Sequence, residues 1–141
     1  MKYLDATPEA GKRFYQDFHD KGKMVMMNLL RFKPKADYTN LESLKPDQEI
    51  TGEEAYQLYM DYTLPELEKS GIKIIFYGKS NSFLIGPESE NWDAILLVGH
   101  QSVAKFIEFS QNKDYLKTAG HRSAALEDSR LLPITEDKKY K

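Results

Sequence analysis

The sequence predicts an α+β domain with a four-stranded antiparallel sheet, on three observations. Its 141 residues suit one domain, which we expect to span residues 1–141. Hydrophobic residues make up 40% and charged residues 30%, a balance typical of a chain that buries a core rather than of a disordered one. Apolar runs of strand length alternate with amphipathic segments, in the order helix, strand, helix, strand, strand, helix, strand.

The first predicted elements are a leading helix over residues 7–21 and a strand over residues 23–32. Thr7 is a good N-cap residue, Pro8 is tolerated in a first helical turn, and Gly22 is suited to end the helix. In the strand, both sets of alternating side chains are mostly apolar. A strand with two apolar faces is expected to be covered on both sides.

A polar segment over residues 33–50 precedes the second helix. Segments of this length are often lids or dimer arms, and a flexible insertion is the equally good alternative. Thr51 and Glu54 then form a capping box, which predicts a helix start at this point. Pro65 interrupts the helical pattern, so we expect a kink and a restart near residue 63.

The second half of the chain continues the alternation of strands and helices. The first strand here either ends at Lys79 or runs on toward Ile85. Pro133 lacks a backbone N–H, which places it either on a strand at a sheet edge or at the end of the strand. The predicted elements are a strand over 72–79, a strand over 92–98, a helix that begins at Ser102 and breaks near Asn112, a helix over 114–127, a strand over 129–134 and a mobile tail over 136–141.

After the leading helix, this order is the ferredoxin-like βαββαβ pattern, which places the helices on one face of the sheet. The other face would be wet in a lone subunit, yet the strands are apolar on both sides. The simplest cover is the same face of a second copy, related by a two-fold axis. The sequence therefore predicts a homodimer.

Several segments resemble the dimeric α/β-barrel superfamily, in which two ferredoxin-like sheets pack face to face. The resemblance lies in residues 24–32, 52–56, 84–87, 92–93 and 114–131. Within the superfamily, the chain is similar to an uncharacterised bacterial domain-of-unknown-function branch related to EthD-like and antibiotic-biosynthesis-monooxygenase-like proteins. The resemblance implies a dimeric barrel. It leaves the activity open, since the superfamily includes cofactor-free monooxygenases, isomerases, haem-degrading enzymes and proteins without an assigned activity.

Arg122 is the most informative candidate for a ligand-binding residue. It shares a predicted helical stripe with Tyr115 and Leu126, and an arginine on an apolar stripe requires a partner. One partner is a carboxylate or enolate ligand, which a guanidinium binds through two hydrogen bonds. The alternatives are a salt bridge to Asp93, Glu127 or Asp128, or a side chain that reaches water.

The other candidate ligand-binding residues are two histidines, one asparagine and two tyrosines. His100 and His121 could each serve as a base or a haem ligand, or be hydrogen-bonded structural residues. Asn28 could orient a substrate oxygen or dioxygen, or satisfy backbone groups. Tyr59 and Tyr77 could line an aromatic pocket or belong to the core.

Composition excludes several other functions. The chain has no cysteine, which removes disulfides and thiol nucleophiles, and no spacing typical of a metal site. A net charge of −2 gives no general attraction to nucleic acid or to a membrane surface. Residues 1–22 do not resemble a signal peptide, so we expect a cytoplasmic protein. We expect a protein that binds a small molecule and uses no cofactor, such as a cofactor-independent monooxygenase or isomerase. The alternative is a non-catalytic dimeric interaction module whose residues 33–50 contact a partner.

Overall fold

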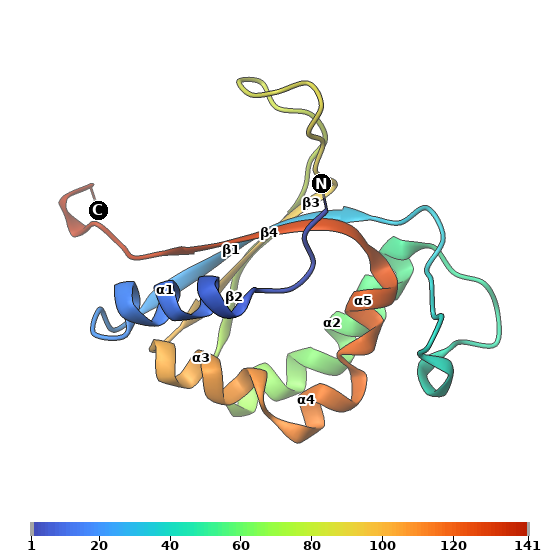
Figure 1. The fold of residues 1–141 in the computed structure, drawn as a ribbon, viewed down its shortest axis with the longest axis horizontal. Helices are drawn as coiled ribbons and strands as arrows, with labels where there is room; N and C mark the ends of the chain where they lie inside the picture. The colour runs from blue at the N-terminus through green and yellow to red at the C-terminus, as the bar shows by residue number, and fades with distance from the viewer. Residues whose placement is uncertain (1, 141) are drawn as a thin grey trace.

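The computed structural model describes residues 2–140, which form a sheet with helices packed on one face (Figure 1). The order of elements is the predicted one, with one predicted helix divided in two. The strands are β1 (Met24–Phe32), β2 (Lys73–Lys79), β3 (Ala94–His100) and β4 (Leu126–Ile134), and the helices are α1 (Pro8–Phe18), α2 (Gly52–Lys69), α3 (Val103–Ser110), α4 (Lys113–Thr118) and α5 (Gly120–Ala125), with short 3₁₀ turns at Glu42–Leu44 and Lys138–Tyr140.

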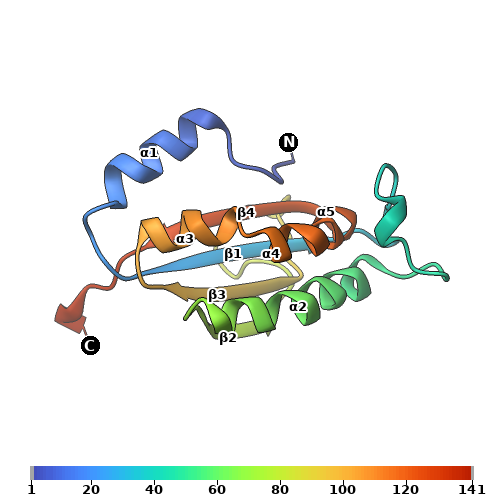
Figure 2. The same ribbon diagram turned by 90° about the horizontal axis from the view of Figure 1, so that it is seen from below.

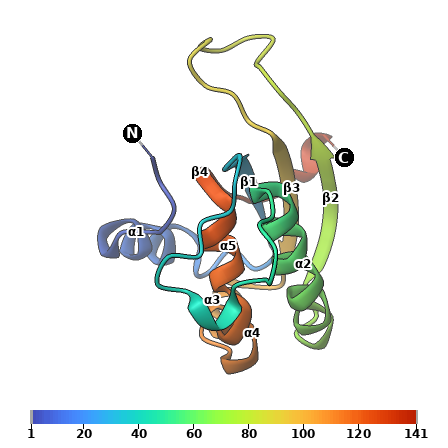
Figure 3. The same ribbon diagram turned by 90° about the vertical axis from the view of Figure 1, so that its right-hand side faces the viewer.

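The sheet has the strand order β2-β3-β1-β4, and every neighbouring pair is antiparallel. Helices α2 to α5 cover one face, as Figures 2 and 3 show. This arrangement confirms the α+β, ferredoxin-like prediction. Strand β4 lies at an edge, in agreement with Pro133.

Helix α1 begins as predicted and ends three residues earlier than predicted, at Phe18. The Thr7 side chain accepts a hydrogen bond from the Ala10 N–H, which caps the first turn. Phe14 packs edge-on against Phe106 of α3, with 5.5 Å between ring centroids. The helix thus extends the layer of helices on the β4 side.

Helix α2 starts with the predicted capping box, in which Thr51 and Glu54 exchange side-chain and backbone hydrogen bonds. The predicted restart near residue 63 is wrong, because the helix continues through Pro65 to Lys69. Proline removes one backbone hydrogen bond. Thr63 and Leu67 are buried on either side of it, and their packing holds the helix against the sheet.

The predicted helix over 114–127 is also wrong: the chain turns at Ala119, α5 begins at Gly120, and β4 already begins at Leu126. A Cβ at Gly120 would lie 2.7 Å from a methyl carbon of Leu44, so α5 sits directly under the 33–50 segment. Leu126 is fully buried and paired with Phe32, which explains why the strand begins there.

The 33–50 segment loops out beside α2 and α5 and is tied to α5 by hydrogen bonds (Figure 1). Asp37 donates its N–H to Ala124 O at 2.9 Å, and Ala36 donates to Ile50 O at the same distance. The buried Tyr38 hydroxyl lies 2.7 Å from His121 Nδ1. This segment therefore has the contacts of a structural strap rather than those of a free arm.

The connection between β2 and β3, residues 80–93, projects from the molecule instead and is called the β2–β3 arm below (Figures 1 and 3). Strand β2 ends at Lys79 and does not run on to Ile85, and β3 starts at Ala94, two residues later than predicted. The base of the arm carries Trp92, which is 2% exposed and lies against the guanidinium groups of Arg31 and Arg130.

The sheet face opposite the helices, called the open face below, is apolar and largely uncovered. Phe76 of β2 is 56% exposed and Leu132 of β4 is 53% exposed. Strand register places both on the same face as Met27 and Leu97, because Phe76 pairs with Leu97 and Leu132 pairs with Met27. The prediction that the strands are apolar on both sides is confirmed.

Within residues 2–140, no helix combines the length and the hydropathy needed to cross a bilayer. The tail predicted over 136–141 contains the short turn Lys138–Tyr140, and residue 141 lies outside the described residues.

Candidate functional site

A cavity of about 240 Å³ lies between the helix-covered face of the sheet and the helices. Strands β1 and β3 form its floor, helices α2 to α5 form its roof, and the segment that leads into α1 forms one side. Its wall is mostly apolar, with a few convergent polar groups, as is typical of small-molecule sites. The polar lining residues are Asp5, Asn28, Tyr56, Tyr59, Thr63, His100, Ser110, Tyr115 and Arg122.

Four of the six candidate residues predicted from the sequence line this cavity. They come from β1, α2, β3 and α5, which are far apart in sequence. The other two, Tyr77 and His121, lie outside it. The four are Asn28, Tyr59, His100 and Arg122.

Arg122 is half-buried in the cavity wall, where its Nη1 donates a hydrogen bond to Leu4 O at 3.0 Å. Within residues 2–140 it forms no salt bridge, so the three predicted pairings are wrong. The reason is that each of the three acidic groups has another partner. Asp93 accepts the Phe32 N–H, Glu127 pairs with Lys2, and Asp128 pairs with Arg130.

Two tyrosines supply a hydroxyl pair at the cavity. The hydroxyl oxygens of Tyr59 and Tyr115 lie 2.9 Å apart, and the rings meet edge to face. Burial raises the pKa of Tyr59 and of Tyr56 well above the ordinary value, although the nearby Arg122 charge opposes this rise. These phenols are therefore protonated at neutral pH and act as hydrogen-bonding groups rather than as bases.

Two buried polar atoms at the cavity have no hydrogen-bond partner among the residues that the structure describes. They are His100 Nδ1 and Thr63 Oγ1. Burial lowers the pKa of His100 to about 4, so its imidazole is neutral at pH 7. Buried polar atoms are normally paired, and leaving one unpaired is costly. Both residues line the cavity, and each has one buried polar atom without a partner.

Asn28 combines the two roles considered from the sequence. Its Nδ2 donates to Leu96 O at 3.2 Å on the neighbouring strand, which fixes the amide. Its Oδ1 accepts no hydrogen bond from the described residues and belongs to the cavity lining. The side chain is therefore oriented by backbone and presents an acceptor.

Tyr77 and His121 lie outside the cavity. Tyr77 is partly exposed on β2, outside the lining. His121 is buried on the opposite side of α5, where Tyr38 bonds its Nδ1 and the Tyr62 ring stacks on it at 5.5 Å. These contacts hold the 33–50 segment to the helices, which is a structural role.

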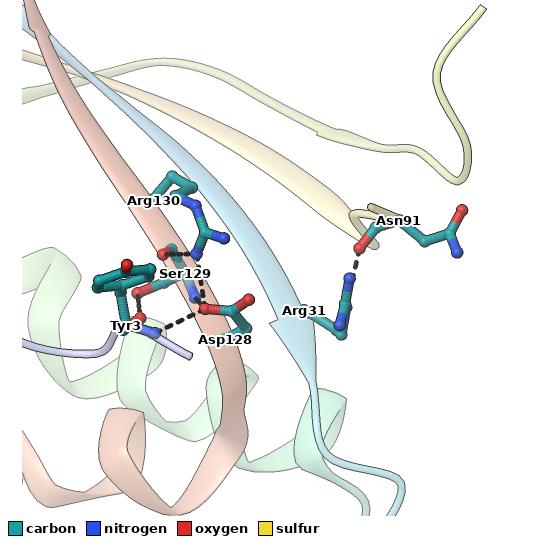
Figure 4. Close-up of polar contacts among 6 residues, drawn as sticks. All are labelled: Tyr3, Arg31, Asn91, Asp128, Ser129 and Arg130. Atoms are coloured by element: carbon teal, nitrogen blue, oxygen red, sulfur yellow. Dashed lines mark hydrogen bonds and ion pairs between the residues drawn. The ribbon is translucent and has the colours of Figure 1, made fainter. Parts of the chain in front are cut away.

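The N-terminal segment, residues 2–6, closes one side of the cavity, and sequence reasoning missed it. Tyr3 donates its N–H to Asp128 Oδ1 at 2.8 Å, and Tyr3 O accepts the hydroxyl of Ser129 at 2.6 Å (Figure 4). These bonds hold Leu4 and Asp5 at the cavity wall. No propensity or spacing signals such a contact, because it depends on where β4 begins.

Within residues 2–140, no group of three or more histidine or acidic side chains could hold a metal ion. The polar groups at the cavity are hydrogen-bond donors and acceptors, together with the charged side chains of Arg122 and Asp5.

The fold and this cavity define a ferredoxin-like α+β protein with a small-molecule-sized site between sheet and helices. Neither a protein-family model nor a curated protein matches the sequence. Among solved structures, the chain is similar to the RPA0582 protein of unknown function from Rhodopseudomonas palustris, with 34% identity and a TM-score of 0.84 over 98% of this chain and 99% of that chain. The chain belongs to the RPA0582 family.

Two further solved structures are similar to this chain. The methylated RPA0582 protein gives 34% identity and a TM-score of 0.85, over 99% of this chain and 98% of that one. A putative antibiotic biosynthesis monooxygenase from Caulobacter crescentus is 7% identical, with a TM-score of 0.50 over 89% of this chain and 99% of that one. That likeness shows the fold alone, and it confirms the predicted relationship at this level.

Proposed function

We propose that the protein is a homodimer that binds a small organic anion, a carboxylate or an enolate with an apolar body, in the cavity between sheet and helices. The observation that carries the proposal is Arg122, a cationic side chain in the wall of a mostly apolar cavity. It forms no salt bridge with the described residues, although Asp5 also lines the cavity. A half-buried guanidinium with free donors is well suited to bind a carboxylate through two hydrogen bonds.

The size and lining of the cavity fit such a ligand. An engineered apolar cavity of about 150 Å³ holds benzene, so a cavity of about 240 Å³ leaves room for a ring and a carboxylate. Asn28, Thr63 and His100 line the cavity and would supply the further polar groups that orient it.

The same groups suit chemistry on an enolate, as in a cofactor-independent monooxygenase or isomerase. Arg122 would stabilise the negative charge of the enolate oxygen, because a fixed charge in a partly dry site acts strongly on a developing charge. The Tyr59–Tyr115 hydroxyl pair would donate to the same oxygen. Binding is the part of this proposal that can be tested without a known substrate.

The first test is calorimetric titration of the protein with phenylacetate and with its uncharged analogue phenylacetamide. A hydrogen-bonded charge is worth about 1.5–3 kcal/mol, so Arg122→Met should weaken phenylacetate binding roughly 10- to 150-fold. Binding of phenylacetamide should change little, because the amide carries no charge. The matched control is Arg13→Met, which removes an exposed arginine of α1.

Equal losses for the two ligands would show that Arg122→Met acts on packing rather than on charge. If neither ligand bound the wild-type protein, the anion proposal would be contradicted for ligands of this size. Loss of binding in Arg13→Met as well would show that the effect does not belong to the cavity.

The homodimer part of the proposal rests on the open face. A large exposed apolar patch on a soluble chain marks an interaction site, and the exposed side chains on this face come from both outer strands. A second copy of the same face offers the same apolar character, as a two-fold interface requires.

Phe76→Asp is expected to convert the dimer to a monomer at micromolar concentration, because the new charge would be buried without a partner. Analytical ultracentrifugation measures the result. Leu116→Asp is the control, since Leu116 is also half-exposed but lies on α4, on the helix side. A wild-type chain that sediments as a monomer would contradict the dimer.

A further inference from the structure

We propose that the β2–β3 arm, residues 80–93, crosses onto a second copy of the chain and packs its apolar tip against that copy, beside the two open faces. The inference rests on the homodimer proposed above. It adds a second contact segment to the proposed interface and specifies how the two copies are oriented, which the apolar sheet faces alone do not.

The arm is held in a hairpin by its own hydrogen bonds. At its base, Ser80 donates to Asp93 O and Trp92 donates to Asn81 O, both at 2.9 Å, and Ser82 and Asn91 form an isolated bridge. At its turn, Gly86 has a φ of 155°, and a Cβ there would lie 2.8 Å from the Phe83 ring. The arm therefore presents its tip in a fixed direction.

The tip is apolar and bare. Leu84 is 100% exposed and Ile85 is 91% exposed, in a run of eight residues, 80–87, that contains no charge. Single exposed apolar residues are ordinary, but two consecutive aliphatic side chains at the end of a projecting hairpin form a contact surface. Figures 1 and 3 show that no other segment among residues 2–140 reaches this tip.

A second copy is the partner that the dimensions favour. Four strands spaced about 4.8 Å apart and about seven residues long, at about 3.3 Å per residue, give a sheet face of roughly 450 Å². A stable specific interface buries about 800 Å² on each partner. An arm from each copy would add its own contact area to that of the two sheet faces.

Charges at the base of the arm indicate the orientation. Arg31 stacks on Trp92 and donates its Nε to Asn91 O at 2.9 Å, but it has no carboxylate partner among the described residues (Figure 4). The arm carries Glu88 and Glu90, which form no salt bridge within residues 2–140. A two-fold axis along the strands would bring the same sheet ends together and place each arm's carboxylates near the partner's arginine.

The experiment compares three variants by sedimentation equilibrium. The double variant Leu84→Asp, Ile85→Asp should raise the dimer dissociation constant at least tenfold, and Leu116→Asp should not. Glu88→Lys with Glu90→Lys should raise it several-fold at low salt and less at high salt, because exposed charge pairs are screened.

The absence of cysteine allows a direct readout of the contact. Ile85→Cys labelled with a benzophenone maleimide is mixed as ¹⁴N and ¹⁵N protein, and crosslinked peptides are identified by mass spectrometry. Mixed-isotope crosslinks are expected.

Same-isotope crosslinks only, with an unchanged dissociation constant in the double variant, would overturn the arm contact while the homodimer stands. A monomeric wild type would overturn both proposals. A crosslink with no effect of the glutamate variants would overturn the orientation.

Discussion

Replacing Gly52 by alanine is expected to lower the free energy of unfolding by about 3 kcal/mol or more, since overpacking of a filled site costs at least 1–3 kcal/mol. A Cβ at this position would meet Lys33 O and would lie 2.6 Å from Ala125 O. Both are backbone oxygens of segments that cross at the start of α2, and Gly52 itself donates to Lys33 O at 3.0 Å. Relief therefore requires moving the backbone rather than rotating a side chain.

The matched control is Gly11→Ala in α1. Nothing lies within 4 Å of a Cβ placed there, and the residue is exposed. Alanine should raise stability by about 0.5–1 kcal/mol, the ordinary helix-propensity gain. Urea denaturation of both variants measures the difference, and a Gly52→Ala protein as stable as the wild type would show that the crossing is looser than these distances indicate.

Asp128→Asn is expected to cost about 2 kcal/mol at pH 7, because the buried carboxylate loses charge-assisted hydrogen bonds, each worth about 1.5–3 kcal/mol, while its partner Arg130 is partly exposed. Asp128 is buried, and one of its oxygens accepts three hydrogen bonds: from Tyr3 N–H at 2.8 Å, from Ser129 N–H at 2.9 Å and from Arg130 Nη1 at 2.7 Å. The amide keeps an acceptor but loses the charge that compensates Arg130. The N-terminal segment should loosen from the cavity as a result.

This loss should depend on pH with a definite sign. Burial favours the neutral form of Asp128, but the hydrogen bonds from Tyr3, Arg130 and Ser129 outweigh it, so the pKa in the folded state is below the ordinary value. The stabilisation is therefore present above the unfolded pKa of about 3.9 and disappears as the pH falls through the folded pKa.

Denaturant unfolding of the wild type and of Asp128→Asn between pH 2 and 7 tests this prediction. The difference in stability between the two should shrink below about pH 4. Asp114→Asn is the control, because Asp114 pairs with Lys117 on the exposed side of α4, and exposed pairs are worth at most about 1 kcal/mol. A difference that did not depend on pH would mean that the charge of Asp128 is not the stabilising feature.

Local patterns in the sequence were sufficient for most of the fold. The capping box at Thr51, the caps at Thr7 and Ser102 and the apolar strands are confirmed, because each depends on a few neighbouring residues. The two errors in α2 and in the 114–127 helix have a common cause. In both places tertiary packing outweighs a local signal. Burial of Thr63 and Leu67 keeps α2 helical through Pro65, and packing of Gly120 under Leu44 ends the helix that the periodicity predicted to continue.

The candidate site was predictable only in part. An arginine or an asparagine among apolar neighbours signals a buried polar group, and Arg122 and Asn28 do line the cavity. Whether a histidine faces the cavity depends on which side of a helix meets the sheet, and for His121 the short α5 turns it toward Tyr38 instead. Their roles in binding stay predictions.

The N-terminal segment and the β2–β3 arm were beyond sequence reasoning for a different reason. The segment is held by residues more than a hundred positions away, so no local pattern marks it. In the arm, Leu84 and Ile85 have the composition of a strand continuation, yet they leave the sheet and become the most exposed aliphatic side chains of the described chain.

Trp92 is the only tryptophan of the chain, and it is enclosed between two guanidinium groups where the arm leaves the sheet. Its indole N–H has no partner within the described residues. The protein thus carries one indole fluorophore, buried between two positive charges at the base of its β2–β3 arm. Its emission spectrum can report movement at the base of the arm without a label, because no second tryptophan contributes to the signal.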